Sequence, residues 1–151
     1  FGLHRFRFMD VAHAIAVAAA AFAAYLVYWN TIAPIYWAIH SDSPEQQFVF
    51  TGPSTIPEYA VTAIALMLNG AAEELVLWSV LFTRLMRLWD NKVATVVFVA
   101  VVFASYHLYQ GVFAMGGVAC MGLVFGGYFA WRGRIWPLII AHALWDLLLM
   151  F

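Results

Sequence analysis

Charged residues are scarce in this chain, and their scarcity excludes most classes of soluble protein. Only 10% of the 151 residues are Asp, Glu, Lys or Arg, whereas 66% are hydrophobic and the mean hydropathy is +0.86. Soluble domains carry roughly 25% charged residues. A net charge of −1 also provides no basic field for nucleic acid. We therefore expect an integral membrane protein that does not bind nucleic acid.

Cysteine is almost absent as well. Cys120 is the only one, so an intrachain disulfide and a thiolate metal cluster are both excluded. It lies in an apolar, glycine-rich stretch, where cysteine behaves as a small hydrophobic residue. The length leaves room for one helical bundle, and we expect a single transmembrane domain over residues 1–151.

Long apolar runs predict the fold class, an all-α bundle of transmembrane helices with about five spans. A helix needs about 20 apolar residues to cross a bilayer. Pro34 marks a kink or an end after the first span, and residues 41–57 are expected to form an external loop, partly re-entrant around 48–50. The expected spans are residues 9–29, 58–85, 93–109, 117–131 and 136–151.

The basic residues predict the orientation of these spans, because loops rich in Lys and Arg stay in the cytoplasm. With five spans, every Lys and Arg falls on one side of the membrane. The N-terminus is therefore expected in the cytoplasm, in a multi-pass protein of a prokaryotic-type inner or plasma membrane with lipids as partners. The seven basic residues are Arg5, Arg7, Arg84, Arg87, Lys92, Arg132 and Arg134.

Five ionisable residues interrupt the expected spans. Glu73 and Glu74 lie in the second span, His107 in the third, and His142 and Asp146 in the fifth. An ionisable group in hydrocarbon costs several kcal/mol unless it faces a partner or a water-filled cavity. Three such helices in one small chain therefore predict a shared buried site.

The chemistry of these groups is that of a hydrolase. A glutamate beside a neutral histidine can activate a water molecule, and a second histidine with a carboxylate can stabilise the resulting oxyanion. Asp146 follows His142 by one helical turn and could orient its ring. Two alternatives stay open. The polar groups could simply pair to hold the bundle together, or Glu73, His107 and His142 could bind a divalent metal, although no HExxH motif is present.

Three sequence motifs resemble those of a known family. The runs AAEELVL at 71–77, FASYH at 103–107 and HALWD at 142–146 resemble the EExxxR, FxxxH and HxxxN/D motifs of the CPBP family. These intramembrane proteases are related to the type II CAAX prenyl endopeptidase and to bacteriocin-processing proteins. The resemblance covers a core of about residues 59–149.

This resemblance implies a glutamate-dependent endopeptidase without a cofactor, acting on a peptide or protein substrate, with lipidated substrates among the candidates. Glu73 would be the general base together with His107, and Glu74 the supporting acid. His142 and Asp146 would help to stabilise the oxyanion.

Trp78 departs from the family pattern, because it occupies the position of the motif arginine. An arginine there could pair with Glu74 at i,i+4, whereas tryptophan offers only an indole donor and bulk. A second hypothesis is therefore an inactive family member that serves as a subunit of a larger membrane complex. In a variant of it, His13 and His40 would ligate a tetrapyrrole pigment.

Overall fold

The structure is a computed structural model that describes residues 2–40 and 52–150, without the side chains of 149 and 150. Its described residues form helices and turns and no strand, so the predicted all-α membrane bundle is confirmed. The expected re-entrant segment at 48–50 lies outside the described residues. The helices are α1 (Met9–Ile39), α2 (Ile56–Glu74), a π-helix (Leu75–Phe82), α3 (Thr83–Trp89), α4 (Lys92–Ser105), a 3₁₀ turn (Leu108–Gln110), α5 (Val112–Arg132) and α6 (Trp136–Met150).

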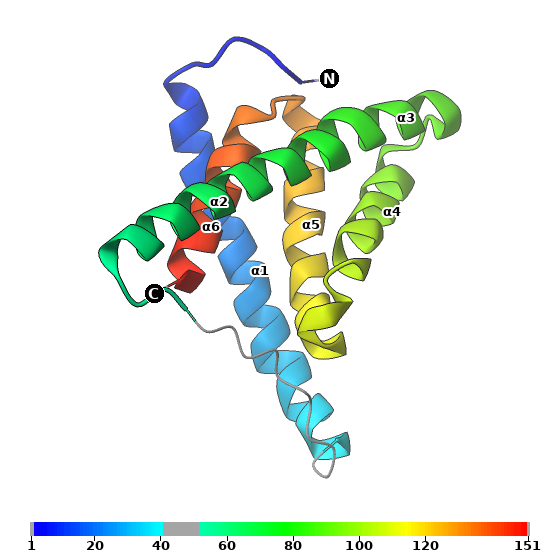
Figure 1. Cartoon of the computed structure of the whole chain (residues 1–151). Helices are drawn as coiled ribbons and strands as arrows, with labels where there is room; N and C mark the ends of the chain where they lie inside the picture. Colours follow the sequence, from blue (N-terminus) through cyan, green and yellow to red (C-terminus); the bar gives the residue numbers. More distant parts are fainter. Residues whose placement is uncertain (1, 41–51, 151) are drawn as a thin grey trace.

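Three helices are long and apolar enough to cross a membrane: Met9–Ile39, the continuous rod Ile56–Trp89, and Val112–Arg132. α4 and α6 are apolar but shorter. In Figure 1 the rod made of α2, the π-helix and α3 crosses in front of α1, α5 and α6 at a slant. α1 packs on α5 and α6, α4 packs on α5, and α2 packs on α6.

Two boundaries differ from the prediction. α1 continues through Pro34 to Ile39, so the proline does not end the helix. A proline removes one backbone donor, and a helix of 31 residues keeps its other hydrogen bonds. α4 ends at Ser105, so His107 lies in a turn rather than inside a helical span.

Glycines allow the helices of the bundle to approach closely, as small residues do in membrane proteins. A Cβ atom on Gly117 would lie 2.9 Å from the Tyr25 ring, and one on Gly122 would lie 3.2 Å from the Ala100 backbone. Gly126 faces Trp78 in the same way, because a Cβ there would lie 2.5 Å from the indole. Each of these positions therefore requires glycine for the observed packing.

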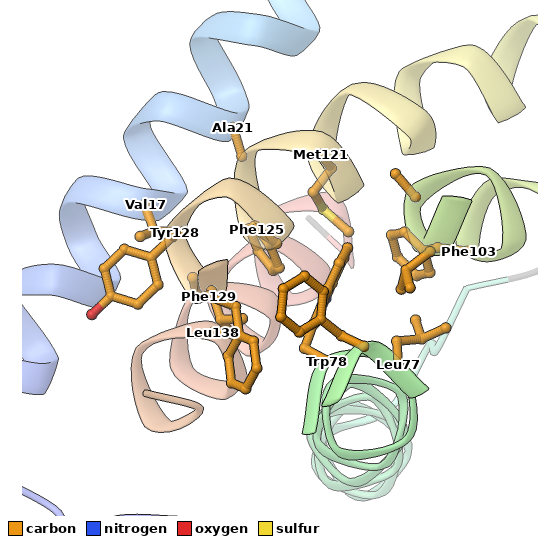
Figure 2. Close-up of a cluster of buried hydrophobic side chains, with 14 of the residues drawn as sticks. Val17, Ala21, Leu77, Trp78, Phe103, Met121, Phe125, Tyr128, Phe129 and Leu138 are labelled. Carbon is orange, nitrogen blue, oxygen red and sulfur yellow. The ribbon is translucent and has the colours of Figure 1, made fainter. Parts of the chain in front are cut away.

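Trp78 is the largest fully buried side chain, with 0% exposure. Figure 2 shows it in the middle of a cluster of apolar side chains, beside Phe125 and Phe129 of α5. The space left by Gly126 accommodates its ring. The residue that replaces the motif arginine is thus part of the core.

A second contact region, which we call the N-terminal clamp, joins the start of α1 to the loop between α5 and α6. Asp10, 1% exposed, accepts hydrogen bonds from Arg134 Nε (2.6 Å), Arg134 Nη2 (2.7 Å) and the Arg7 amide (2.8 Å). The hydrogen bond with Asp10 raises the pKa of Arg134. The Ile135 amide also donates to Gly2 O at 3.2 Å. In Figure 1 the N-terminal segment accordingly arches over this end of the bundle.

Candidate active site

Glu74 and His142 meet at the contact between α2 and α6. Glu74 Oε1 lies 2.7 Å from His142 Nδ1, and the two residues are 0% and 3% exposed. Gly70, one turn before Glu74, makes the approach possible, because a Cβ there would lie 3.1 Å from the imidazole. The partner of Glu74 is therefore a histidine from another helix, in place of an arginine on its own helix.

Two further carboxyl groups face the other nitrogen of this imidazole. His142 Nε2 lies 3.6 Å from Glu73 Oε2 and 3.7 Å from Asp146 Oδ1. Both distances are too long for a direct hydrogen bond but short enough for strong electrostatic interaction. Glu73 Oε1 accepts a hydrogen bond from Asn69 Nδ2 at 2.9 Å. One imidazole is thus surrounded by three carboxyl groups.

Two oxygens of the site are buried without a hydrogen-bond donor from any described residue. They are Glu73 Oε2 and Glu74 Oε2. Buried polar atoms without a partner are rare in native structures, and they are common where a protein performs chemistry. Glu73 Oε2 is the one that faces His142 Nε2.

His107 approaches from the turn after α4. Its Nδ1 lies 2.9 Å from the carbonyl oxygen of Phe103, and because a carbonyl only accepts, Nδ1 carries the proton and Nε2 keeps a free lone pair. The Phe103 ring makes edge contacts with both imidazoles, at 5.0 Å from His107 and 6.0 Å from His142. Among the described residues no hydrogen bond or ion pair joins His107 directly to Glu73.

A cavity of about 180 Å³ connects these groups. His107, His142 and Asp146 all face it, while Glu73 and Glu74 reach it only through their contacts with His142. The remaining wall is mostly aromatic and comes from α1, α5 and α6. Its other lining residues are Tyr25, Tyr28, Trp29, Gln110, Phe113, Ala114, Gly117, Val118, Met121 and Trp145.

The α1 part of this wall was missed by the sequence interpretation. Tyr25, Tyr28 and Trp29 lie on the Ala-rich first helix, where they give no chemical motif. The Tyr28 hydroxyl donates to Phe113 O at 2.8 Å and fixes that wall to α5. Aromatic residues at a four- or three-residue spacing are the only signal that could have indicated a shared face.

The ligand alternatives gain no support from the geometry. Within residues 2–40 and 52–150, no three His, Cys, Asp or Glu side chains are arranged to hold a metal ion, which includes Glu73, His107 and His142. His13 Nδ1 lies 3.0 Å from the Tyr128 hydroxyl. His40 Nδ1 lies 3.0 Å from Tyr36 O, with its ring stacked on Tyr36. Both proposed tetrapyrrole ligands already have protein partners.

Comparison with known proteins identifies the family. The family model for type II CAAX prenyl endopeptidase Rce1-like proteins matches residues 55–148, more than half of the chain. The match runs from the start of α2 into α6 and includes all five candidate site residues. No curated protein and no solved structure matches the chain. Proteases of this family act within membranes on prenylated peptides and use a glutamate without a metal or cofactor. The chain therefore belongs to the Rce1-like family of type II CAAX prenyl endopeptidases, which confirms the resemblance found in its motifs.

Proposed function

We propose that this protein is an active intramembrane endopeptidase that hydrolyses a peptide bond in a prenylated peptide, with Glu73 as the general base. The observation that carries this proposal is the buried, unpartnered Glu73 Oε2, 3.6 Å from His142 Nε2. A carboxylate oxygen with no donor of its own is free to accept the proton of an attacking water.

In the proposed reaction Glu73 takes a proton from water while the water oxygen forms a bond to the scissile carbonyl carbon. His107 Nε2, with its free lone pair, is the second acceptor for the same water. The carbonyl oxygen becomes an oxyanion. The carbon–nitrogen bond then breaks, and the proton held by Glu73 passes to the leaving amine.

The oxyanion is assigned to His142. A His142 imidazolium gives its Nδ1 proton to Glu74 and keeps its Nε2 proton for the substrate. Glu74 then serves as a positioning residue, because its single hydrogen bond fixes the direction of Nε2. Asp146, 3.7 Å from Nε2, assists this charge from the same helix.

Trp78 is compatible with this activity. The lost arginine would have been the partner of Glu74, and His142 now fills that role at 2.7 Å. The indole is seated against Gly126 and so displaces no site residue. This arrangement supports the endopeptidase over the inactive, pigment-binding subunit.

We also propose that residues 1–151 act as one membrane domain with the N-terminus in the cytoplasm of a prokaryotic-type cell, the five apolar helical segments all crossing the bilayer. In support, Figure 1 places the N-terminal segment, α3 and the loop between α5 and α6 at one end of the bundle. These three segments carry the seven basic residues.

The test is cleavage of a fluorogenic prenylated peptide by the protein reconstituted in liposomes, with the product mass measured by mass spectrometry. Glu73→Gln should reduce the rate by about 1,000-fold. The matched control is Glu58→Gln, which changes an exposed glutamate at the start of the same helix. Chelation with EDTA should leave the rate unchanged.

Retention of full activity by Glu73→Gln would assign the base to another residue. A folded wild-type protein that cleaves no prenylated peptide, in contrast, would favour the inactive subunit.

A further inference from the structure

A basic cleft lies beside the N-terminal clamp, far in sequence from the catalytic glutamates. Its volume is about 320 Å³, and four of its five lining residues carry or can carry a positive charge. Asp10 neutralises Arg134, but Arg7 and Arg132 form no ion pair with any described residue. The cleft therefore presents two uncompensated guanidinium groups. The lining residues are His4, Arg7, Trp131, Arg132 and Arg134.

An apolar groove of about 470 Å³ lies between α4 and α5. Gly127 deepens it, because a Cβ atom there would meet nothing within 4 Å. Lys92 is the single charged residue that lines it, and it too forms no ion pair with a described residue. The other lining residues are Val93, Val96, Val97, Leu123, Ala130 and Trp131.

Trp131 belongs to both the basic cleft and the apolar groove. Its side chain is 74% exposed, and the Arg132 guanidinium lies over its ring at 4.8 Å from the centroid. Tryptophan at the end of a membrane helix is typical of the headgroup level of a bilayer. The groove and the cleft therefore meet at the depth where the chains of a lipid join its headgroup.

We propose that the basic cleft and the apolar groove together form a binding site for one anionic phospholipid. The phosphate lies in the cleft against Arg7 and Arg132, which match its geometry through two parallel N–H donors. One acyl chain lies in the groove along Gly127. Lys92 adds a third positive charge at the groove rim. The site shares no residue with the candidate active site and does not depend on the proposed reaction.

The experiment is native mass spectrometry of the detergent-solubilised protein with dioleoyl phosphatidylglycerol or dioleoyl phosphatidylcholine. Each arginine near an anionic headgroup contributes about fivefold, so the wild type should prefer phosphatidylglycerol by about 30-fold. The double variant Arg7→Gln/Arg132→Gln should lose this preference. Arg7→Lys/Arg132→Lys should keep most of it, which would show that the double variant is still folded. Gly127→Leu should weaken the binding of both lipids equally.

Two controls match these variants. Arg87→Gln removes a basic residue of α3 that lines neither cavity, and Val101→Leu enlarges an exposed residue of α4 outside the groove. Both should bind lipid as the wild type does. Equal retention of the two lipids by the wild type would overturn the proposal, as would an equal loss of preference in Arg87→Gln. Unchanged binding by Gly127→Leu would remove the acyl chain from the groove. Displacement of the lipid by glycerol phosphate at equal concentration would identify a soluble phosphate ligand instead.

Discussion

Two buried carboxyl groups of this protein, Asp10 and Glu74, each meet a basic side chain from the C-terminal part of the chain, but their hydrogen bonding differs. Asp10 accepts three hydrogen bonds, two of them from Arg134. Glu74 accepts one, from His142, and its second oxygen has no donor among the described residues. The first carboxylate is fully satisfied, whereas the second is not.

This difference separates a structural contact from a candidate catalytic one. A saturated, bidentate pair of carboxylate and guanidinium fixes two segments and has no capacity left for a substrate. The α2–α6 contact keeps unpaired oxygens on two glutamates beside a histidine with a free nitrogen. Polar groups left unsatisfied in a buried place cost free energy, which is consistent with their retention for function.

Glu74→Gln should have the largest effect. An amide oxygen can still accept the Nδ1 hydrogen bond, but it cannot stabilise an imidazolium at His142. We expect kcat to fall by about 100-fold. KM should stay within a factor of two, about the error of the measurement, and steady-state kinetics on the prenylated peptide measure both. A raised KM with an unchanged kcat would place Glu74 in substrate binding instead.

Asp10→Asn should give the converse result at the N-terminal clamp. Removal of one partner leaves the other charge without compensation, so Tm in detergent should fall by several degrees. The rate per folded molecule should not change, because Asp10 lines no part of the active-site cavity. Thermal unfolding monitored by tryptophan fluorescence, together with the peptide assay, checks both statements. A loss of kcat at unchanged Tm would contradict the structural role.

Gly126→Ala tests whether the apolar packing behind the glutamates is as complete as the clamp. The new Cβ would lie 2.5 Å from Trp78, and such overpacking costs about 1–3 kcal/mol of unfolding free energy. Trp78→Leu in the same chain should restore much of this loss. Gly127→Ala is the matched control, because its Cβ meets nothing within 4 Å. Equal destabilisation by both alanines would show that the loss comes from the glycines themselves and not from Trp78.

Asn69→Ala should have the smallest effect. Asn69 is exposed and gives one hydrogen bond to Glu73 Oε1, so we expect kcat/KM to fall by about threefold. The unfolding free energy should change by less than about 0.5 kcal/mol. A 100-fold loss would make Asn69 part of the reacting centre.

The sequence predicted well what depends on local spacing. The i,i+4 relation of His142 and Asp146 and the placement of Glu73 beside Asn69 both follow from the helical period, and both occur in the structure. The family motifs predicted the class of protease, and the family model confirms it. Local periodicity carries this information because the residues concerned share one helix.

Contacts between distant segments could not be predicted in the same way. The bond from Glu74 to His142 joins residues 68 positions apart, and the sequence offered only Trp78 as a poor substitute for a partner. Hydropathy did not indicate the end of α4 at Ser105, because the residues that follow are also largely aromatic and apolar. The α1 wall of the cavity depends on the packing of α1 against α5 and α6, which no single motif encodes.

The π-helix at Leu75–Phe82 begins directly after Glu74. A π-helix places more residues in each turn than an α-helix does, because its hydrogen bonds run from i to i+5. Residue numbers that share a face in an α-helix therefore diverge across this segment, and position 78 does not lie above Glu74 as the motif spacing assumes. Deletion of one residue between 75 and 82 would return the rod towards an α-helical register and rotate α3 relative to the glutamates. The wide turn thus acts as an angular offset between the reactive part of the rod and its basic end.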